Sequence, residues 1–194
     1  MSSARTSDTI REAARDLFYE KGYEATSLRE VAAAVGVKVS SLYNHIDGKQ
    51  SLLVSMMDAI MGDLGRAQAD ALANRTDSLD RLRAVLDCHV RFHAERAQDV
   101  FIGNSELRSL HAEARGKIVA LRDAYERQIS AAIAAACSEA GVELIDLRLQ
   151  TYAVVAAGSH VSAWYRPGGT MTLDEIVDIY TTMAFRQLGL QPAA

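Results

Sequence analysis

The sequence predicts an all-α protein of about nine helices, and two observations lead to that fold class. The first is the scarcity of proline: the 194 residues contain only Pro167 and Pro192, so residues 1–166 have none. Proline breaks helix interiors because it lacks an N–H donor and clashes with the preceding turn. The second is the recurrence of apolar side chains at helical spacing along most of the chain, with no segment typical of a strand.

Three short helices are expected in the first 50 residues. Asp8 is the predicted N-cap of the first helix, which ends at Gly22. Ser27 precedes a glutamate by three residues, which is the spacing of a capping box, and starts a second helix that ends at Gly36. A third helix is expected over residues 38–45. These helices together predict a small N-terminal unit.

Six longer helical segments follow and predict a larger bundle. Their ranges are 49–72, 79–92, 98–111, 118–137, 144–161 and 172–188. The third of them is expected to bend at Gly103, the fourth stops at Gly141, and Pro167 follows the end of the fifth. Thr172 is the predicted cap of the last helix. The first long helix is expected to join the two parts of the chain rigidly.

Charge and composition narrow the class of protein. The apolar stretches, such as residues 153–158, are far shorter than the ~20 residues that span a bilayer. Residues 1–8 lack the apolar segment of a signal peptide. The two cysteines, Cys88 and Cys137, fall inside helical patterns and are expected to be reduced thiols. We therefore expect a cytoplasmic protein without a membrane partner and without a cofactor.

Residues 27–46 have the pattern of a helix-turn-helix. Ala32 supplies the small side chain where two helices approach closely, and Gly36 supplies the turn. Leu42 is expected in the core that the two helices share. The exposed face of the second helix, which would lie toward the DNA major groove, carries Lys38, Val39, Ser40, Ser41 and Asn44.

Here the sequence closely resembles the TetR family of one-component transcriptional regulators. The resemblance covers residues 10–55, and its most specific segments are 22–27, 31–37, 42–45 and 49–52. Lys38, Ile46 and Gly48 depart from the residues common in the family. The resemblance implies a helix-turn-helix DNA-binding domain at residues 1–50 and a ligand-binding and dimerisation domain at residues 51–194.

The resemblance also implies which residues contact operator DNA. They are Thr26, Ser27, Lys38, Val39, Ser40, Ser41, Tyr43, Asn44, His45 and Lys49. Hydroxyl, imidazole and ammonium groups suit phosphate oxygens, whereas Lys38, Asn44 and Val39 suit base edges or a thymine methyl. For Tyr43 the alternative is a core position. The chain's formal net charge is −4, but residues 1–50 carry seven basic and seven acidic side chains, so binding would depend on local placement of charge.

An apolar effector pocket is expected between the helices of the bundle. Its candidate lining residues, each of which could instead be ordinary core or surface, are Phe92, His93, Phe101, Ile102, Arg122, Tyr125, Tyr152 and Trp164. Residues 164–169 are similar to a stretch in an actinobacterial branch of the family that controls breakdown of sterol or fatty-acid CoA thioesters. The same residues also read as a helix stop at Pro167. An acyl- or sterol-CoA thioester is therefore the candidate effector.

Two-fold operators require a two-fold protein, so a homodimer is expected. Small and apolar side chains on the last two helices predict the interface, formed by Ala153, Ala157, Val161, Ile176, Ile179, Tyr180 and Met183.

The resulting prediction is a dimeric repressor, not an enzyme, that a small-molecule effector releases from its operator. Two alternatives stay open. His89 and His93 have the i, i+4 spacing of metal ligands, which His111 or Glu106 could join, so a metal-responsive regulator competes with an organic-effector sensor. The same spacing suits a pair of core or pocket histidines, which the sequence favours. A helical-bundle metal or small-molecule enzyme is the other alternative.

Overall fold

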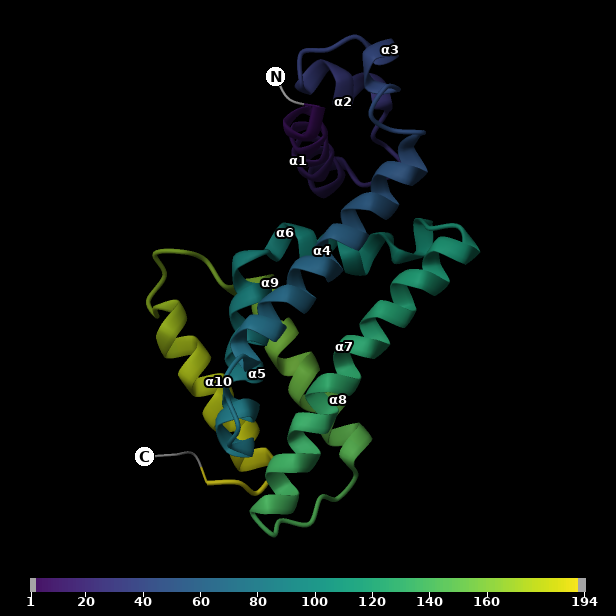
Figure 1. The fold of residues 1–194 in the computed structure, drawn as a ribbon. Helices are drawn as coiled ribbons and strands as arrows, with labels where there is room; N and C mark the ends of the chain where they lie inside the picture. Colours follow the sequence, from purple (N-terminus) through teal and green to yellow (C-terminus); the bar gives the residue numbers. More distant parts are fainter. Residues whose placement is uncertain (1–2, 192–194) are drawn as a thin grey trace. The chain divides into compact units, whose positions relative to one another are not determined.

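The computed structural model describes residues 3–191, which are helical throughout and contain no strand (Figure 1). The helices are α1 (Ser3–Lys21), α2 (Leu28–Ala34), α3 (Val39–Leu42), α4 (Lys49–Leu72), α5 (Ser78–Glu95), α6 (Ala97–Ser105), the 3₁₀ helix η1 (Glu106–Ser109), α7 (Ala112–Glu139), α8 (Leu147–Ser159), α9 (Val161–Trp164) and α10 (Leu173–Gln187). The prediction of an all-α fold is confirmed, and α8 with α9 corresponds to one predicted helix.

The chain forms two compact units, each made of two stretches of sequence. The first contains the residues up to Gly62 together with Gln98–Ala120, and the second contains Asp63–Ala97 together with the residues from Leu121 onward. Helices α4 and α7 each run from one unit into the other. These packing units differ from the division at residue 50, which remains a prediction about functional domains.

The first unit has its own apolar core. The buried faces of α1, α2, α3 and α4 meet there, because apolar residues recur along each helix at three- and four-residue spacing. Residues from beyond α4 complete this core. Its fully or almost fully buried members include Ile10, Phe18, Val31, Leu42, Leu53, Met57, Ile102 and Ile118.

Several predicted boundaries and a predicted bend in this unit are wrong. Helix α1 already includes Ser3, upstream of the predicted cap Asp8, whose carboxylate instead pairs with Arg11 one turn later. Helix α3 ends at Leu42, earlier than expected. Helix α6 passes through Gly103, which is buried within it, and ends at Ser105, where the 3₁₀ helix η1 follows.

In the second unit, α5 packs against α8, α9 and α10. Side-chain caps fix where these helices start: Asp77 caps α5, Asp146 caps α8, and Thr172 caps α10 in a full capping box with Glu175. Buried residues of α5, α7, α8 and α10 form the larger of its two apolar clusters. None of the helices within residues 3–191 is long and apolar enough to cross a bilayer.

Candidate nucleic-acid interface and bundle interior

Helices α2 and α3 form the predicted helix-turn-helix. Gly36 adopts φ +71° in the turn, a conformation that side chains disfavour, and the Val37 N–H donates to the Ala32 carbonyl over 2.9 Å. Leu42 is fully buried, as predicted. The buried Leu42 fixes which face of α3 points inward.

The opposite face of α3 and the residues after it are accessible. Lys38, Ser40, Tyr43 and Asn44 are exposed, whereas Val39, Ser41 and His45 are half-buried. Tyr43 is 54% exposed, which favours a surface role for this side chain over a core position. The predicted base- and phosphate-contacting residues at positions 38–45 are therefore all at least partly accessible.

Ser27 caps the N-terminus of α2. Its hydroxyl accepts from the Glu30 N–H over 3.3 Å, and the Glu30 carboxylate accepts from the Ser27 N–H over 2.8 Å. The Lys21 ammonium lies 2.8 Å from the same carboxylate. The hydrogen bonds from Lys21 and Ser27 lower the pKa of Glu30 to about 2, so the Glu30 carboxylate of the capping box is ionised at neutral pH.

Thr26 does not present its hydroxyl for a phosphate contact. Its side chain is 2% exposed, and the hydroxyl lies 2.9 Å from the Gly22 carbonyl and 3.2 Å from the Leu17 carbonyl. The Thr26 N–H donates to the carbonyl of Tyr23. The predicted contact is thus corrected: this threonine closes the end of α1, because a hydroxyl there satisfies carbonyls that the helix leaves unpaired.

Lys49 begins α4 and lies against the turn between α1 and α2. Its ammonium nitrogen is 4.2 Å from the centre of the Tyr23 ring and donates to the Glu24 carbonyl over 3.2 Å. The Tyr23 ring and the Glu24 carbonyl therefore hold the ammonium group of Lys49 in a defined position.

In the second unit, the side chain of His89 links three helices. The Tyr125 hydroxyl on α7 lies 2.8 Å from His89 Nδ1, and the Val155 carbonyl on α8 lies 3.0 Å from Nε2. A carbonyl only accepts, so Nε2 carries the proton and Nδ1 accepts from the tyrosine. Burial, and then the nearby His93, lower the pKa of His89 to about 3, so the ring is neutral.

The arrangement around His93 favours the buried-histidine interpretation of the i, i+4 pair. His93 Nδ1 donates to the His89 carbonyl over 2.7 Å, and both ring nitrogens of His89 already have partners. No group of three or more His, Cys, Asp or Glu side chains within the described part of the chain could hold a metal ion. His111 and Glu106 belong to the other compact unit.

The predicted effector-lining residues divide between the two units. Phe101 and Ile102 belong to the first unit: Ile102 is fully buried in its core, and Phe101 packs edge-on against Tyr19 with ring centres 5.2 Å apart. Phe101 and Ile102 therefore take part in packing within the first unit. The other six candidate lining residues belong to the second unit.

Only part of the set within the second unit comes together. His93 and Tyr125 contact His89: the two histidine ring centres are 4.2 Å apart, and the Tyr125 hydroxyl lies 2.8 Å from His89 Nδ1. The charge of Arg122 contributes to lowering the pKa of His93, after burial. Phe92 is buried beside His93 on α5, with ring centres 6.0 Å apart.

Tyr152 and Trp164 lie instead on exposed parts of α8 and α9. The Tyr152 hydroxyl accepts from Arg148 Nε over 3.0 Å, and Trp164 stacks on Tyr180 with ring centres 6.4 Å apart. Both side chains therefore lie at the surface of the unit.

One polar residue of the bundle was missed by the sequence reasoning. Gln68 on α4 is 1% exposed, and neither its amide nitrogen nor its oxygen has a hydrogen-bond partner in the structure. A buried amide without partners is costly, so the site suits a polar group of a bound molecule. The available signal was an amide one helical turn from both Leu64 and Leu72, on an otherwise apolar face.

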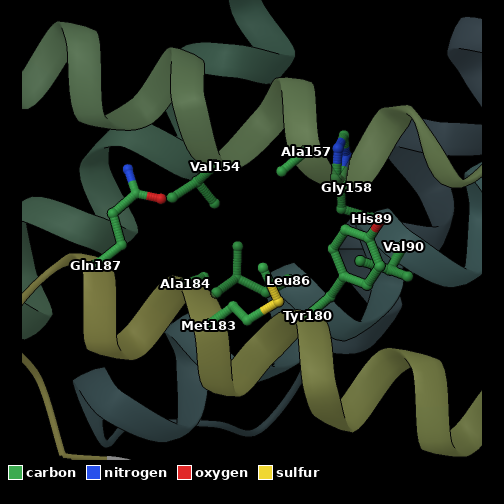
Figure 2. Close-up of a pocket in the computed structure, with 10 residues that line it drawn as sticks. All are labelled: Leu86, His89, Val90, Val154, Ala157, Gly158, Tyr180, Met183, Ala184 and Gln187. Carbon is green, nitrogen blue, oxygen red and sulfur yellow. The ribbon is translucent and has the colours of Figure 1, made fainter.

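A narrow cavity of about 40 Å³ lies between α5, α8 and α10 (Figure 2). It is lined by Leu86, His89, Val90, Val154, Ala157, Gly158, Tyr180, Met183, Ala184 and Gln187. Small-molecule sites usually have volumes of about 300–1,000 Å³, so this cavity is too small for a CoA thioester.

The predicted dimer residues fall into two groups. Ala153, Ala157, Ile179 and Met183 are exposed and Tyr180 is half-buried, and these form an accessible small and apolar face on α8 and α10. The other two predictions are corrected: Val161 and Ile176 are buried in a small core with α5 residues, because they lie on the inward faces of their helices.

The glycine-linked pair α2–α3, with a capped first helix and an exposed second helix over a shared core, defines a helix-turn-helix DNA-binding protein. The family model described as "Bacterial regulatory proteins, tetR family" matches residues 10–56. A second model, "Tetracyclin repressor-like, C-terminal domain", matches residues 75–188. The chain therefore belongs to the TetR family of transcriptional regulators, and this membership assigns it to regulators rather than enzymes.

Relatives of known name agree with this assignment. The HTH-type transcriptional repressor KstR2 of Rhodococcus jostii (strain RHA1) is 28% identical over 177 residues, covering 88% of this chain and 84% of the relative. A tetR-family regulatory protein from Rhodococcus RHA1 superposes with a TM-score of 0.88 at 27% identity, covering 99% and 100% of the two chains. AibR in complex with isovaleryl coenzyme A and operator DNA superposes with a TM-score of 0.83 at 25% identity, covering 92% and 97%.

Proposed function

We propose that this protein is a homodimeric transcriptional repressor that a small-molecule effector releases from operator DNA. The observation that carries the proposal is the helix-turn-helix with an accessible α3, followed in the same chain by a separate helical unit with buried polar groups. In this proposal residues 1–50 bind DNA, and residues 51–194 bind the effector and dimerise.

At the operator, the exposed residues around α3 contact the major groove and its phosphates. Lys38, Val39, Ser40, Ser41 and Asn44 face the bases, and Tyr43, His45 and Lys49 bind phosphate. Ser27 contributes through the N-terminus of α2, where backbone N–H groups favour an anion. Thr26 has no direct contact in this proposal, since its hydroxyl is buried.

The dimer forms through the accessible face of α8 and α10. Ala153 and Ala157 allow close approach of helices, and Ile179 and Met183 supply apolar area at 46% and 57% exposure. A two-fold pair of such faces gives the two recognition helices a fixed spacing, as palindromic operators require.

The proposed effector is an acyl- or sterol-CoA thioester. The complex of AibR with isovaleryl coenzyme A and operator DNA supports an effector of this class. Gln68 offers an amide with no partner, and Arg122 offers a cation near His93. A coupling of about 1–3 kcal/mol between effector and operator would change DNA affinity roughly 5–150-fold.

Gel-shift titration with duplex DNA from upstream of the protein's own gene tests the proposal. A salt-sensitive, sequence-specific shift is expected, and addition of isovaleryl-CoA or a steroid-CoA thioester should weaken it. A dimeric protein that binds this DNA no better than a shuffled duplex would refute the assignment as a regulator of its own upstream region. Specific binding that no CoA thioester alters would refute the effector class alone.

A further inference from the structure

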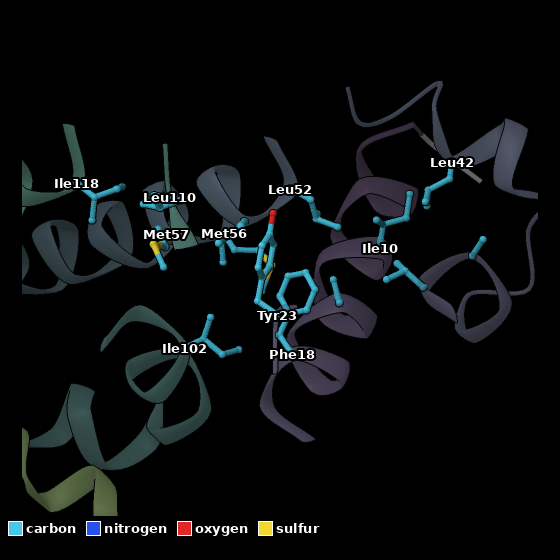
Figure 3. Packing of buried hydrophobic residues seen from close by; sticks show 14 residues of the cluster. Ile10, Phe18, Tyr23, Leu42, Leu52, Met56, Met57, Ile102, Leu110 and Ile118 are labelled. Carbon is cyan, nitrogen blue, oxygen red and sulfur yellow. The ribbon is translucent and has the colours of Figure 1, made fainter. Parts of the chain in front are cut away.

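Tyr23, in the turn between α1 and α2, contacts residues of α1, α4 and η1. Its ring packs edge-on against Phe18 with ring centres 5.2 Å apart, and its face carries the Lys49 ammonium at 4.2 Å. Figure 3 shows the ring between Phe18 of α1 and the α4 residues Leu52 and Met56. The hydroxyl accepts from Gln50 on α4, and the backbone N–H donates to Glu106 on η1.

Glu106, the first residue of η1, holds the backbone of this turn. Its carboxylate is 8% exposed and accepts from the Tyr23 N–H over 3.3 Å and from the Ser109 hydroxyl over 2.8 Å. A buried carboxylate that loses such donors is strongly destabilised. The hydrogen bond from the Tyr23 N–H therefore fixes both the Glu106 side chain and the turn between α1 and α2.

Gln50, the second residue of α4, holds the tyrosine side chain. Its amide nitrogen donates to the Tyr23 hydroxyl over 3.1 Å and to the Ser109 carbonyl over 3.1 Å. Its amide oxygen accepts from the His111 N–H over 2.8 Å. The amide therefore connects α4 and Tyr23 to the chain on both sides of residue 110.

We propose that Glu106 and Gln50 are positioning residues for the phosphate contact of Lys49, and that they act through Tyr23. Operator affinity then depends on where residues 106–111 lie, although none of them touches DNA. This inference rests on the proposed DNA-binding function. It goes beyond that function, because it assigns control of a DNA contact to a segment of the chain between α6 and α7.

The direction in which Glu106→Ala changes DNA affinity distinguishes a positioning role of Glu106 from a simple effect of its charge. Removing an acidic side chain from a DNA-binding unit should raise DNA affinity, because the repulsion of phosphate decreases. If Glu106 positions Lys49, Glu106→Ala lowers affinity instead. Glu106→Gln removes the charge but keeps an oxygen that accepts from the Tyr23 N–H, so its DNA affinity should equal or exceed that of the unmodified protein.

The experiment measures the dissociation constant of the full-length protein for a duplex selected from random-sequence DNA, over a range of KCl concentrations. Glu106→Ala and Gln50→Ala are expected to weaken binding about tenfold and to reduce the slope of log K against log salt by about 0.9 per lost phosphate contact. Lys49→Ala should give the same change in slope. Combining Lys49→Ala with Glu106→Ala should then add little, because both remove one contact.

Asn104→Ala, an exposed neutral change in the neighbouring helix α6, is the matched control and should leave affinity and slope unchanged. Wild-type affinity and slope in both Glu106→Ala and Gln50→Ala would overturn the inference, and so would full additivity with Lys49→Ala. If Glu106→Ala does not fold, Gln50→Ala decides by the same criteria. Failure of the unmodified protein to select any duplex would refute the proposed function and is thus a distinct outcome.

Discussion

Gly158 brings the backbone of α8 against the imidazole of His89 on α5. A Cβ atom built at this glycine would lie 2.6 Å from His89 Cδ2 and 3.1 Å from Nε2. Real side chains do not approach that closely, and the histidine is held by Tyr125 and Val155, so it has little freedom to move away. The glycine therefore permits the hydrogen bonds that join three helices.

Gly158→Ala is expected to lower the free energy of unfolding by about 1–3 kcal/mol, because the added methyl forces the histidine or the helix to shift. Urea denaturation at fixed protein concentration measures the change. Gly65→Ala is the matched control: apart from its chain neighbours and the backbone of its own helix, no atom lies within 4 Å of the new Cβ, so improved helix propensity should stabilise by about 0.5–1 kcal/mol. Equal behaviour of the two variants would contradict the close approach.

His89 should also make stability depend on pH. Its pKa is about 3 in the folded protein because of burial and the nearby His93, against about 6.5 in an unfolded chain. Below pH 6.5 the unfolded chain takes up a proton that the folded protein does not. The free energy of unfolding therefore falls on acidification, by up to about 1.4 kcal/mol per pH unit from this group.

The measurement is urea denaturation between pH 7 and pH 5, above the range in which most carboxylates titrate. His89→Gln removes the titrating ring and should flatten the dependence, while lowering stability at pH 7 because the bonds to Tyr125 and Val155 are disturbed. His93, whose pKa is also lowered by burial, should leave a residual slope. An unchanged slope in His89→Gln would exclude His89 as its source.

Among the elements, α2 and α10 begin with the same device. Ser27 with Glu30, and Thr172 with Glu175, each form a complete capping box with similar distances. Helix α2 belongs to the helix-turn-helix, whereas α10 belongs to the second unit. Substitutions in the two capping boxes can therefore separate the effect of a cap on stability from its effect on DNA binding.

Ser27→Ala and Thr172→Ala should each cost about 1 kcal/mol in unfolding free energy, because each leaves a helix N–H without its side-chain acceptor. Only Ser27→Ala should also weaken operator binding, by disturbing the N-terminus of α2. Thermal melting and gel shift on the same samples compare the two effects. Equal loss of DNA affinity in both variants would show that the α2 cap has no specific part in binding.

Local signals predicted most element starts, because a cap or a turn depends on residues a few positions apart. The box at Ser27, the turn at Gly36, the range of α4 and the cap at Thr172 were all foreseen and are confirmed. The start of α1 was not, because Asp8 is a good cap by type but is stabilised within the helix by Arg11.

Long-range contacts could not be foreseen in the same way. The bond between Glu106 and Tyr23 joins residues 83 positions apart, and the one between His89 and Val155 joins residues 66 apart. Helical periodicity says which face is buried but not against which helix it packs. This is why Val161 and Phe101 were assigned to an interface and a pocket, whereas each belongs to packing within its own unit.

For the whole molecule, the proposed dimer depends on the accessible face of α8 and α10. Met183→Glu places a carboxylate on this face and should convert the dimer to a monomer, because burying an unpaired charge costs several kcal/mol. Sedimentation velocity measures the state, and operator affinity should fall with it. Met171→Glu makes the same substitution before α10 and should leave the dimer intact; a dimeric Met183→Glu would exclude this face as the interface.

The first compact unit is made of two separate stretches of sequence, so it cannot be expressed as one continuous fragment. Because residues 98–120 complete the core around Phe18 and Met57, a fragment that stops at Gly62 would lose Ile102 and Ile118 and expose the apolar surface they cover. Such a fragment should bind DNA poorly for want of a folded core rather than for want of contacts. No single cut of the chain yields either unit whole, so limited proteolysis should release no stable N-terminal piece.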